Sequence, residues 1–393
     1  MDSKIGFVIP VIGIPHQKYL YHLYQIFNLS NKVLIGFWID YNGWSDEIEN
    51  YILISKKNLI WRIFNKIHYN YQALFYRITK QFFIPILPLG WKKQLKHIIK
   101  KNRITGLIIN YGGLGVALLP LLKELKIPFI VTFEGSDAQV SDISRLASKK
   151  LRELWKISEK NIFVSKFLEQ QALTRGCPAS NCTVVYNAIN IIHNYNYLKP
   201  QKPIKLVCVA NLYPVKGHIY LLKAIKQVIK YIPDIILYLI GDGELLDELN
   251  NFTIDNKLTD NVIFLGRIKW ESVQKKLSEC NIYIQTSVKA DDGQEEGLSF
   301  STIEAQSLGL PAIVYNSGGL KEIVENNVTG FIIPERSIDE LADAIIHLSS
   351  NEKLHKEMSH AANVRMKKLF NMENQAKIWN SLFNELFIMD YKK

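Results

Sequence analysis

Two glutamates, Glu296 and Glu304, form the most chemically suggestive pair in the chain. Glu296 lies in a loop after a predicted strand, and Glu304 lies just inside the next predicted helix, with seven residues between them. A carboxylate at either place can accept hydrogen bonds from sugar or ribose hydroxyls. The segment Gly297-Leu298-Ser299 offers backbone N–H groups and a helix N-terminus to an anion such as a diphosphate. The pattern therefore indicates a ligand that carries both hydroxyls and phosphate.

The same segment also has a purely structural interpretation. Ser301 and Glu304 are spaced as in a capping box, in which the glutamate only closes the first turn of the helix. The spacing alone leaves both interpretations open.

A lysine in a second strand-to-helix loop could neutralise the phosphates. Lys216 follows the predicted strand 205–210 and precedes the predicted helix 218–232. An ammonium group at such a loop is well placed for a diphosphate. The alternative is an exposed loop lysine that binds no ligand.

Two further turns follow predicted strands of the second half. Gly241 comes directly after the strand 235–240, and Arg267 and Ile268 come after the strand 262–265. Ligands of open α/β sheets bind at the carboxyl ends of strands, so these turns belong to the same predicted site.

The elements that must position these loops are strands alternating with helices in both halves. The predicted strands 4–10, 32–39 and 104–110 are separated by helical or longer segments, and the pattern restarts at residue 205. Such alternation predicts parallel sheets covered by helices on both faces. The fold class is therefore α/β, with two Rossmann-like doubly wound domains.

The predicted domain limits follow from this pattern. A chain of 393 residues suits two domains. We predict a first Rossmann-like domain over 1–193, a polar, proline-containing linker over 194–203 and a second Rossmann-like domain over 204–365. A helical tail over 366–393 could pack back on the first domain.

Positive charge is concentrated in the first half of the chain. Residues 1–200 hold 26 Lys and Arg against 12 Asp and Glu, whereas residues 201–393 hold 22 against 25. No acidic residue occurs between Glu49 and Glu124, where basic and aromatic residues alternate, chiefly over 56–103. This composition suits an anionic membrane surface. It also suits a solvated helical face over an aromatic core, or nucleic acid, although no nucleic-acid motif accompanies it.

Several features argue against secreted, membrane-spanning and metal-binding classes of protein. The amino terminus lacks the pattern of a signal peptide, and no run of 18 apolar residues predicts a membrane-spanning helix. The four cysteines form no CxxC pair, so we expect reduced thiols in a cytoplasmic protein. No His/Cys cluster and no DxD triplet predicts a metal site.

The motifs around Glu296 extend into a longer string that resembles a known family. The string continues through Leu308–Pro311, Asn316–Glu322 and Thr329–Phe331, and it is similar to the carboxyl-terminal half of the family 4 glycosyltransferases. These are retaining enzymes with the GT-B fold. The stretch Asp291–Gly297 is most similar to members that build bacterial exopolysaccharides, such as colanic-acid-type transferases.

The resemblance covers most of the chain and implies a role for each donor-side residue. Glu296 and Lys216 would be catalytic: Glu296 would hold the sugar ring and Lys216 the diphosphate. Glu304 would hold the ribose. The remaining implied donor contacts are Asn211, Gly241, Arg267, Ile268, Gly297, Leu298 and Ser299.

This sequence departs from the family pattern at three positions, one on the donor side and two on the sugar or acceptor side. Asn211 stands where the family usually has an arginine on the diphosphate, and Arg267 is a candidate to share that role. Glu134 and Asn110 stand where many members carry histidines that face the sugar, and Gly13 is predicted on the same sugar or acceptor side. A glutamate accepts hydrogen bonds but cannot replace imidazole as a donor or cation.

The implied activity is a retaining transfer from a nucleotide sugar to a saccharide acceptor, and domain closure would exclude water from the site.

 The departing phosphate oxygen can take the acceptor proton, so neither a cofactor nor a metal is expected. The basic region suggests a lipid-linked acceptor and a peripheral position at the inner face of the cell membrane.

Other classes stay open at this point. A catalytically inactive relative that serves as a binding or assembly partner would fit the substitutions at Asn211 and Glu134. A nucleotide-sugar epimerase shares the fold. A dehydrogenase is disfavoured because no GxGxxG follows the first strand.

Overall fold

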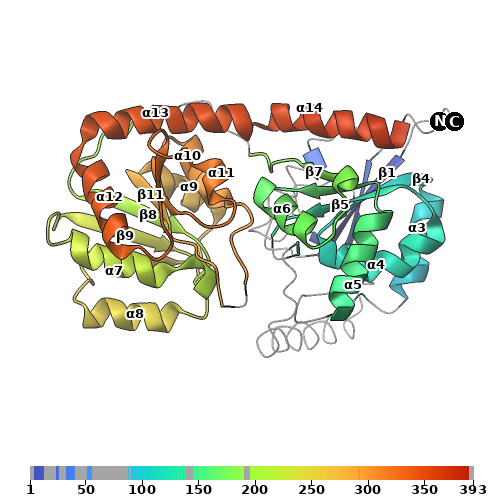
Figure 1. The fold of residues 1–393 in the computed structure, drawn as a ribbon, viewed down its shortest axis with the longest axis horizontal. Coiled ribbons are helices and arrows are strands. Elements are labelled where there is room, and N and C mark those ends of the chain that lie inside the picture. Colours follow the sequence, from blue (N-terminus) through green and yellow to red (C-terminus); the bar gives the residue numbers. More distant parts are fainter. Residues whose placement is uncertain are drawn as a thin grey trace. The chain divides into compact units, whose positions relative to one another are not determined.

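The computed structural model in Figure 1 describes most of the chain as two compact units. The described residues are 4–12, 24–25, 32–39, 51–54, 87, 90–135, 137–138, 145–189, 195–291 and 293–388. Unit 1 comprises residues 1–188 together with 375–393, and unit 2 comprises residues 189–374. The predicted limits at 193, 203 and 365 stay a prediction.

Unit 1 is built on a parallel sheet of seven strands. Their order is β3-β2-β1-β4-β5-β6-β7, so the chain winds outward in both directions from β1 and β4. The strands are β1 (Lys4–Ile12), β2 (Lys32–Ile39), β3 (Tyr51–Leu53), β4 (Ile104–Asn110), β5 (Phe129–Phe133), β6 (Lys160–Phe163) and β7 (Cys182–Val184). The central strands β4 and β5 are almost continuously apolar because both faces of a parallel sheet are buried.

The described helices of unit 1 cover this sheet. They are α3 (Trp91–Lys101), α4 (Gly112–Leu125), α5 (Arg145–Ile157) and α6 (Lys166–Thr174). Helix α4 packs beside α5, and Gly115 allows this approach because a Cβ there would lie 2.6 Å from the Leu154 side chain. At the carboxyl ends of the strands, Phe133 stacks on Phe163 with ring centroids 4.9 Å apart.

Unit 2 repeats the same architecture with six parallel strands. Their order is β10-β9-β8-β11-β12-β13. The strands are β8 (Ile204–Val209), β9 (Ile235–Ile240), β10 (Val262–Gly266), β11 (Ile282–Gln285), β12 (Ala312–Tyr315) and β13 (Gly330–Ile333). The predicted pair of doubly wound parallel sheets is therefore confirmed.

Helices cover both faces of the second sheet. Side chains of α7 (His218–Val228), α8 (Leu246–Asp255) and α12 (Ile338–Ser350) form one core layer. Side chains of α9 (Trp270–Ser278), α10 (Phe300–Ser307) and α11 (Leu320–Ile323) pack on the other face. The loops that leave β8, β9, β10 and β11 consequently emerge at one edge, where the predicted donor residues lie.

The chain ends in helices that return to unit 1. Helix α13 (Glu352–Leu369) belongs to unit 2, α14 (Met372–Phe383) crosses the boundary between residues 374 and 375, and a short π-helix, Asn384–Ile388, follows. Phe387 is buried against Gly106 of β4, where a Cβ would lie 2.4 Å from the ring. The last turns of the chain thus complete the packing of the first sheet.

All four cysteines are free thiols, as expected. Cys177, Cys208 and Cys280 are buried, and Cys182 is half-buried with its sulfur 3.3 Å from that of Cys177.

Candidate active site

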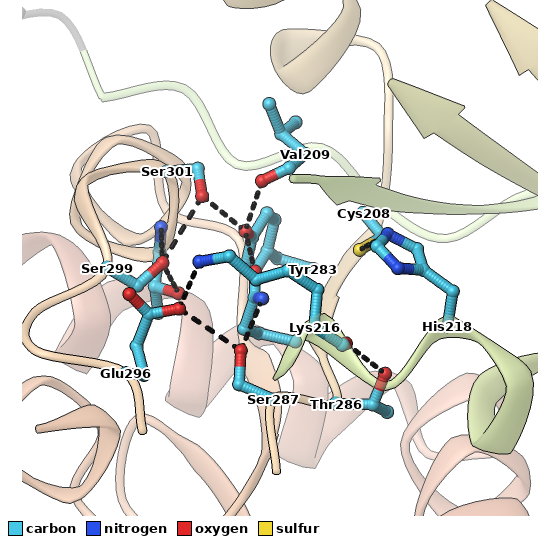
Figure 2. A network of polar contacts seen from close by, with 12 residues as sticks. Cys208, Val209, Lys216, His218, Tyr283, Thr286, Ser287, Glu296, Ser299 and Ser301 are labelled. Carbon is cyan, nitrogen blue, oxygen red and sulfur yellow. Dashed lines mark hydrogen bonds and ion pairs between the residues drawn. The ribbon is translucent and has the colours of Figure 1, made fainter. Parts of the chain in front are cut away.

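The predicted lysine and the first predicted glutamate meet as an ion pair in unit 2. The Lys216 ammonium group contacts Glu296 Oε2, although the residues are 80 positions apart in the chain. Their side chains are 21% and 10% exposed, so the pair is shielded from bulk water yet still reachable. Figure 2 shows the two side chains pointing toward each other from separate loops.

The loop that carries Lys216 is fixed by its backbone. Lys216 ends a short 3-10 turn, Pro214–Lys216, and Gly217 follows with a φ of 63°. A Cβ on Gly217 would lie 2.0 Å from the Thr286 carbonyl oxygen, and the Thr286 hydroxyl donates to the Gly217 carbonyl at 3.1 Å. Only glycine fits there, and the loop is thereby held against the end of β11.

The loop that carries Glu296 is held by three neighbours. The Ser287 hydroxyl donates to Glu296 Oε2 at 3.1 Å, and the Gly319 N–H donates to the Glu296 carbonyl at 2.9 Å. Gly318 has a φ of 52°, and a Cβ on it would lie 2.0 Å from that same carbonyl oxygen. The carboxylate therefore projects from a backbone that has little room to shift.

The helix after Glu296 begins at Ser299. The Ser299 hydroxyl accepts a hydrogen bond from the Thr302 N–H at 3.3 Å, and its backbone is extended as a cap requires. Gly297, Leu298 and Ser299 are all buried. The capping-box interpretation is wrong, because Ser301 lies inside α10 and Glu304 does not close the helix start.

Glu304 instead accepts a hydrogen bond from a tryptophan. The Trp270 indole N–H donates to Glu304 Oε1 at 2.7 Å. Burial raises the pKa of Glu304 to about 7, and the indole hydrogen bond opposes this shift. A carboxylate that gains hydroxyl donors from a ligand would be further stabilised in its charged form.

The other donor-side residues lie on the neighbouring loops. Gly241 has a φ of 143°, and a Cβ there would lie 2.0 Å from the Ala210 carbonyl, so it locks its loop beside Asn211. Asn211 and Arg267 are exposed, and Ile268 is half-buried. Within the described part of the chain, neither Asn211 nor Arg267 forms a side-chain hydrogen bond or ion pair with Lys216 or Glu296.

The sequence interpretation missed a buried histidine beside this site. His218 begins α7, and its Nε2 lies 3.9 Å from the Cys208 sulfur (Figure 2). Burial, followed by the nearby Lys216 charge, lowers the pKa of His218 to about 3. The imidazole is therefore neutral at physiological pH and adds no charge to the site.

A second carboxylate site lies in unit 1. Glu134 follows β5, and its oxygens accept hydrogen bonds from Asn187 Nδ2 at 2.7 Å and from Asn110 Nδ2 at 3.2 Å. Burial raises the pKa of Glu134 to about 7, with Asp137 adding a smaller upward contribution. Asn110 and Glu134 were both predicted on the sugar or acceptor side, and the structure brings them together.

Asp137 organises the backbone around Glu134. Its carboxylate accepts from the N–H groups of Glu134 and Gly135 at 3.0 and 2.8 Å, and from the Gly112 N–H at 2.9 Å. The roles of Asp137 and Asn187 depend on contacts that the sequence does not display. Gly13 lies outside the described residues.

The described residues hold neither a metal-binding cluster nor a membrane-spanning helix. They contain no cluster of three or more His, Cys, Asp or Glu side chains arranged to hold a metal ion. They also contain no helix that is both long and apolar enough to cross a membrane.

Known families match two successive parts of the chain. The model for glycosyl transferases group 1 matches residues 193–365, and the model for glycosyltransferase family 4 matches residues 63–192. Together these matches cover both the Glu134 and the Glu296 regions.

Individual relatives come from polysaccharide synthesis. The amylovoran biosynthesis glycosyltransferase AmsK of Erwinia amylovora is 27% identical over 259 residues, which are 64% of this chain and 63% of that protein. A UDP-Gal:alpha-D-GlcNAc-diphosphoundecaprenol alpha-1,3-galactosyltransferase of Escherichia coli is 31% identical over 150 residues, covering 37% of this chain and 36% of that protein. The chain thus matches less than two thirds of the length of either relative.

The fold is shared with solved structures. HepE of Anabaena, solved in complex with UDP, superposes with a TM-score of 0.76 at 16% identity, covering 98% of this chain and all of HepE. The predicted GT-B fold is confirmed.

Proposed function

The chain belongs to the family 4 glycosyltransferases, and we propose that it moves a sugar, with retention of anomeric configuration, from a nucleotide sugar to a lipid-linked saccharide. We further propose that this reaction serves cell-surface polysaccharide synthesis. The observation that carries the proposal is the shielded Lys216–Glu296 ion pair. Glu296 lies three residues before Ser299, the N-cap of α10. A cation and a helix N-terminus suit the diphosphate of a nucleotide sugar, and a carboxylate suits its hydroxyls.

Different residues of unit 2 would bind the diphosphate, the sugar and the ribose of the donor. In the proposal the diphosphate binds Lys216 and the buried Gly297-Leu298-Ser299 backbone, and the sugar hydroxyls bind Glu296. The ribose binds Glu304, and Gly241, Arg267 and Ile268 border the nucleotide. Negative charge grows on the diphosphate as the glycosidic bond breaks, and a preorganised ammonium group stabilises it.

Proton and charge balance need no further group in this proposal. The acceptor hydroxyl attacks the anomeric carbon, the bond to the diphosphate breaks, and a phosphate oxygen takes the acceptor proton. Glu296 supports the positive charge that develops on the sugar. We accordingly propose a hexosyl transfer without a metal or another cofactor.

The nucleotide is either uridine or guanosine diphosphate. The HepE structures contain UDP or UDP-glucose, and the E. coli relative is named for UDP-Gal. Other relatives are named as GDP-mannose-dependent mannosyltransferases. Both classes of donor therefore belong in the first assay.

In this proposal unit 1 binds the acceptor and the membrane. On α3, Lys92 and Lys96 pair with Glu124, whereas Lys93 and Lys100 are exposed and have no carboxylate partner among the described residues. We propose that α3 and the rest of 56–103 bind an anionic membrane at its cytoplasmic face. Binding to anionic liposomes that weakens with salt is expected, and binding that is absent or insensitive to salt would contradict this part.

A second candidate function is binding without catalysis. Asn211 is exposed and carries no charge, so phosphate neutralisation rests more heavily on Lys216 than it would with an arginine at that position. An inactive assembly partner would bind a nucleotide sugar and release no nucleotide. Turnover with any donor excludes it.

The first experiment is a thermal-shift screen of UDP- and GDP-sugars with the wild type and Glu304→Ala. We expect one donor class to raise the melting temperature of the wild type by several degrees and that of Glu304→Ala by much less. Thr253→Val is the matched control, because Thr253 is a buried residue of α8 whose hydroxyl bonds only the Leu249 carbonyl, at 2.8 Å. No stabilisation by any donor would contradict the proposal.

A further inference from the structure

Strand β11 and its extension carry polar side chains where a buried strand should be apolar. Tyr283, Gln285 and Ser287 alternate along the chain, so they lie on one face, and each is 0% exposed. Burying an amide or a hydroxyl is costly unless it is hydrogen-bonded. Hydrogen bonds link these side chains in a row that ends at Glu296, and Figure 2 labels Tyr283, Ser287 and Glu296 in it.

The hydrogen bonds in this row have a fixed direction. Gln285 Nε2 donates to Ser287 Oγ at 2.8 Å, which leaves the Ser287 hydroxyl proton for Glu296 Oε2 at 3.1 Å. Gln285 Oε1 can only accept, and it accepts from the Tyr283 hydroxyl at 2.8 Å. Every proton in the row therefore points toward the Glu296 carboxylate.

The far end of the row reaches the start of α10. Tyr283 Oη lies 2.7 Å from Ser301 Oγ, and Ser301 Oγ lies 3.2 Å from Ser299 Oγ. The Tyr283 hydroxyl can donate to Ser301 Oγ and to the Val209 carbonyl, 3.4 Å away, as well as to Gln285 Oε1. The cap of α10 and the Glu296 carboxylate, both proposed donor contacts, thus share one buried network.

We propose that Ser287 and Gln285 are positioning residues that hold the Glu296 carboxylate in its orientation when Lys216 leaves it for the donor diphosphate. This inference rests on the proposed function. Without a donor, Lys216 is paired with Glu296, and one ammonium group cannot stay centred on the carboxylate while it also neutralises a diphosphate. The row then supplies the remaining stabilisation of the carboxylate, because aligned hydrogen bonds to a charged acceptor are stronger than neutral ones.

The kinetic test compares Ser287→Ala and Gln285→Met with the wild type. We expect kcat to fall roughly 10- to 100-fold in both variants, as for loss of a hydrogen bond to a charged group. The affinity for UDP or GDP alone should change less than about twofold, because the nucleotide does not contact Glu296. Ser287→Thr keeps the hydroxyl and should restore most of kcat, whereas Thr253→Val should leave kcat unchanged.

A second measurement does not depend on turnover. In a Lys216→Met background Glu296 has lost its ammonium partner, so Ser287→Ala should lower the melting temperature more there than in the wild type. Additive effects of Lys216→Met and Ser287→Ala, or an unchanged kcat in Gln285→Met, would overturn the inference. If the wild type transfers no sugar, the proposed function fails, and the non-additivity still decides whether the row supports Glu296.

Discussion

The two units each place a carboxylate near the carboxyl end of a central strand, but they surround it differently. Glu296 in unit 2 faces the ammonium group of Lys216 and the Ser287 hydroxyl. Glu134 in unit 1 accepts from the amides of Asn110 and Asn187 and forms no ion pair with a described residue, and burial raises its pKa to about 7. A phosphate-bearing ligand can take the cation from the first carboxylate, whereas the second has neutral donors and a buried position that favours its protonated form.

The largest expected effect comes from removing the cation. Lys216→Met leaves Glu296 without its ammonium partner and the proposed diphosphate site without its charge, so kcat/KM should fall roughly 1000-fold. Lys223→Met is the control, because Lys223 is an exposed residue of the adjacent helix α7. Steady-state kinetics with the preferred donor measures both variants. A loss of kcat/KM below about tenfold for Lys216→Met would contradict the proposed role of Lys216 at the diphosphate.

Alanine substitutions at the glycines beside the two carboxylates should differ in how much they destabilise the protein. Gly318→Ala places a Cβ 2.0 Å from the Glu296 carbonyl at a φ of 52°, so it should destabilise the protein by about 2 kcal/mol or more. Gly135 has no atom within 4 Å of the added Cβ, and Gly135→Ala should change stability by less than about 1 kcal/mol. Denaturant unfolding measures both, and equal costs would show that the two loops are equally constrained.

The pH dependence of stability should reveal Glu134, the carboxylate that forms no ion pair with a described residue. Glu134 binds its proton more tightly in the folded state than in the unfolded chain, so its contribution is fully present below about pH 4.5 and is lost as pH rises through about 7. Glu134→Gln removes this titration and should flatten the fall in melting temperature between pH 5 and 8. Asn187→Asp adds a titratable group at the same place and serves as the contrasting variant; an unchanged profile in Glu134→Gln would refute the environment described for it.

The smallest effect is expected at the partner of Glu304. Trp270→Phe keeps an aromatic ring but removes the hydrogen bond to Glu304 Oε1, which should raise the pKa of Glu304 above about 7. Donor affinity at pH 7 should then weaken roughly 5- to 10-fold and recover in part at pH 8. Calorimetric titration at the two pH values measures this, and an equal loss at both would leave the hydrogen bond without an electrostatic role.

Much of the architecture could be predicted from the sequence. The strands 104–110 and 235–240 were predicted with the bounds that the structure has, because each is a short apolar run followed by a glycine-containing turn. Helices α5, α8 and α12 were not predicted. Apolar side chains nevertheless recur there at helical spacing, as at Leu341, Ile345 and Leu348 of α12, so the period itself could have predicted these helices.

The site was harder to predict than the sheets. Lys216 and Glu296 were both assigned to the donor, but their ion pair joins residues 80 positions apart and depends on how two loops pack. Ser301 was considered as a helix cap because its spacing to Glu304 fits the pattern, whereas the extended backbone at Ser299 decides the true cap. The row of Tyr283, Gln285 and Ser287 leaves no signal in a sequence, since only the fold shows that those polar groups are buried.

The return of the chain to unit 1 has a consequence for the order in which the protein is made. Unit 2 is one continuous stretch, 189–374, and all of it can be present before synthesis ends. Unit 1 waits for residues 375–393, including Phe387, which fills the space left by Gly106 in a strand translated some 280 residues earlier. The half of the protein that leaves the ribosome first is therefore the half whose core is closed last.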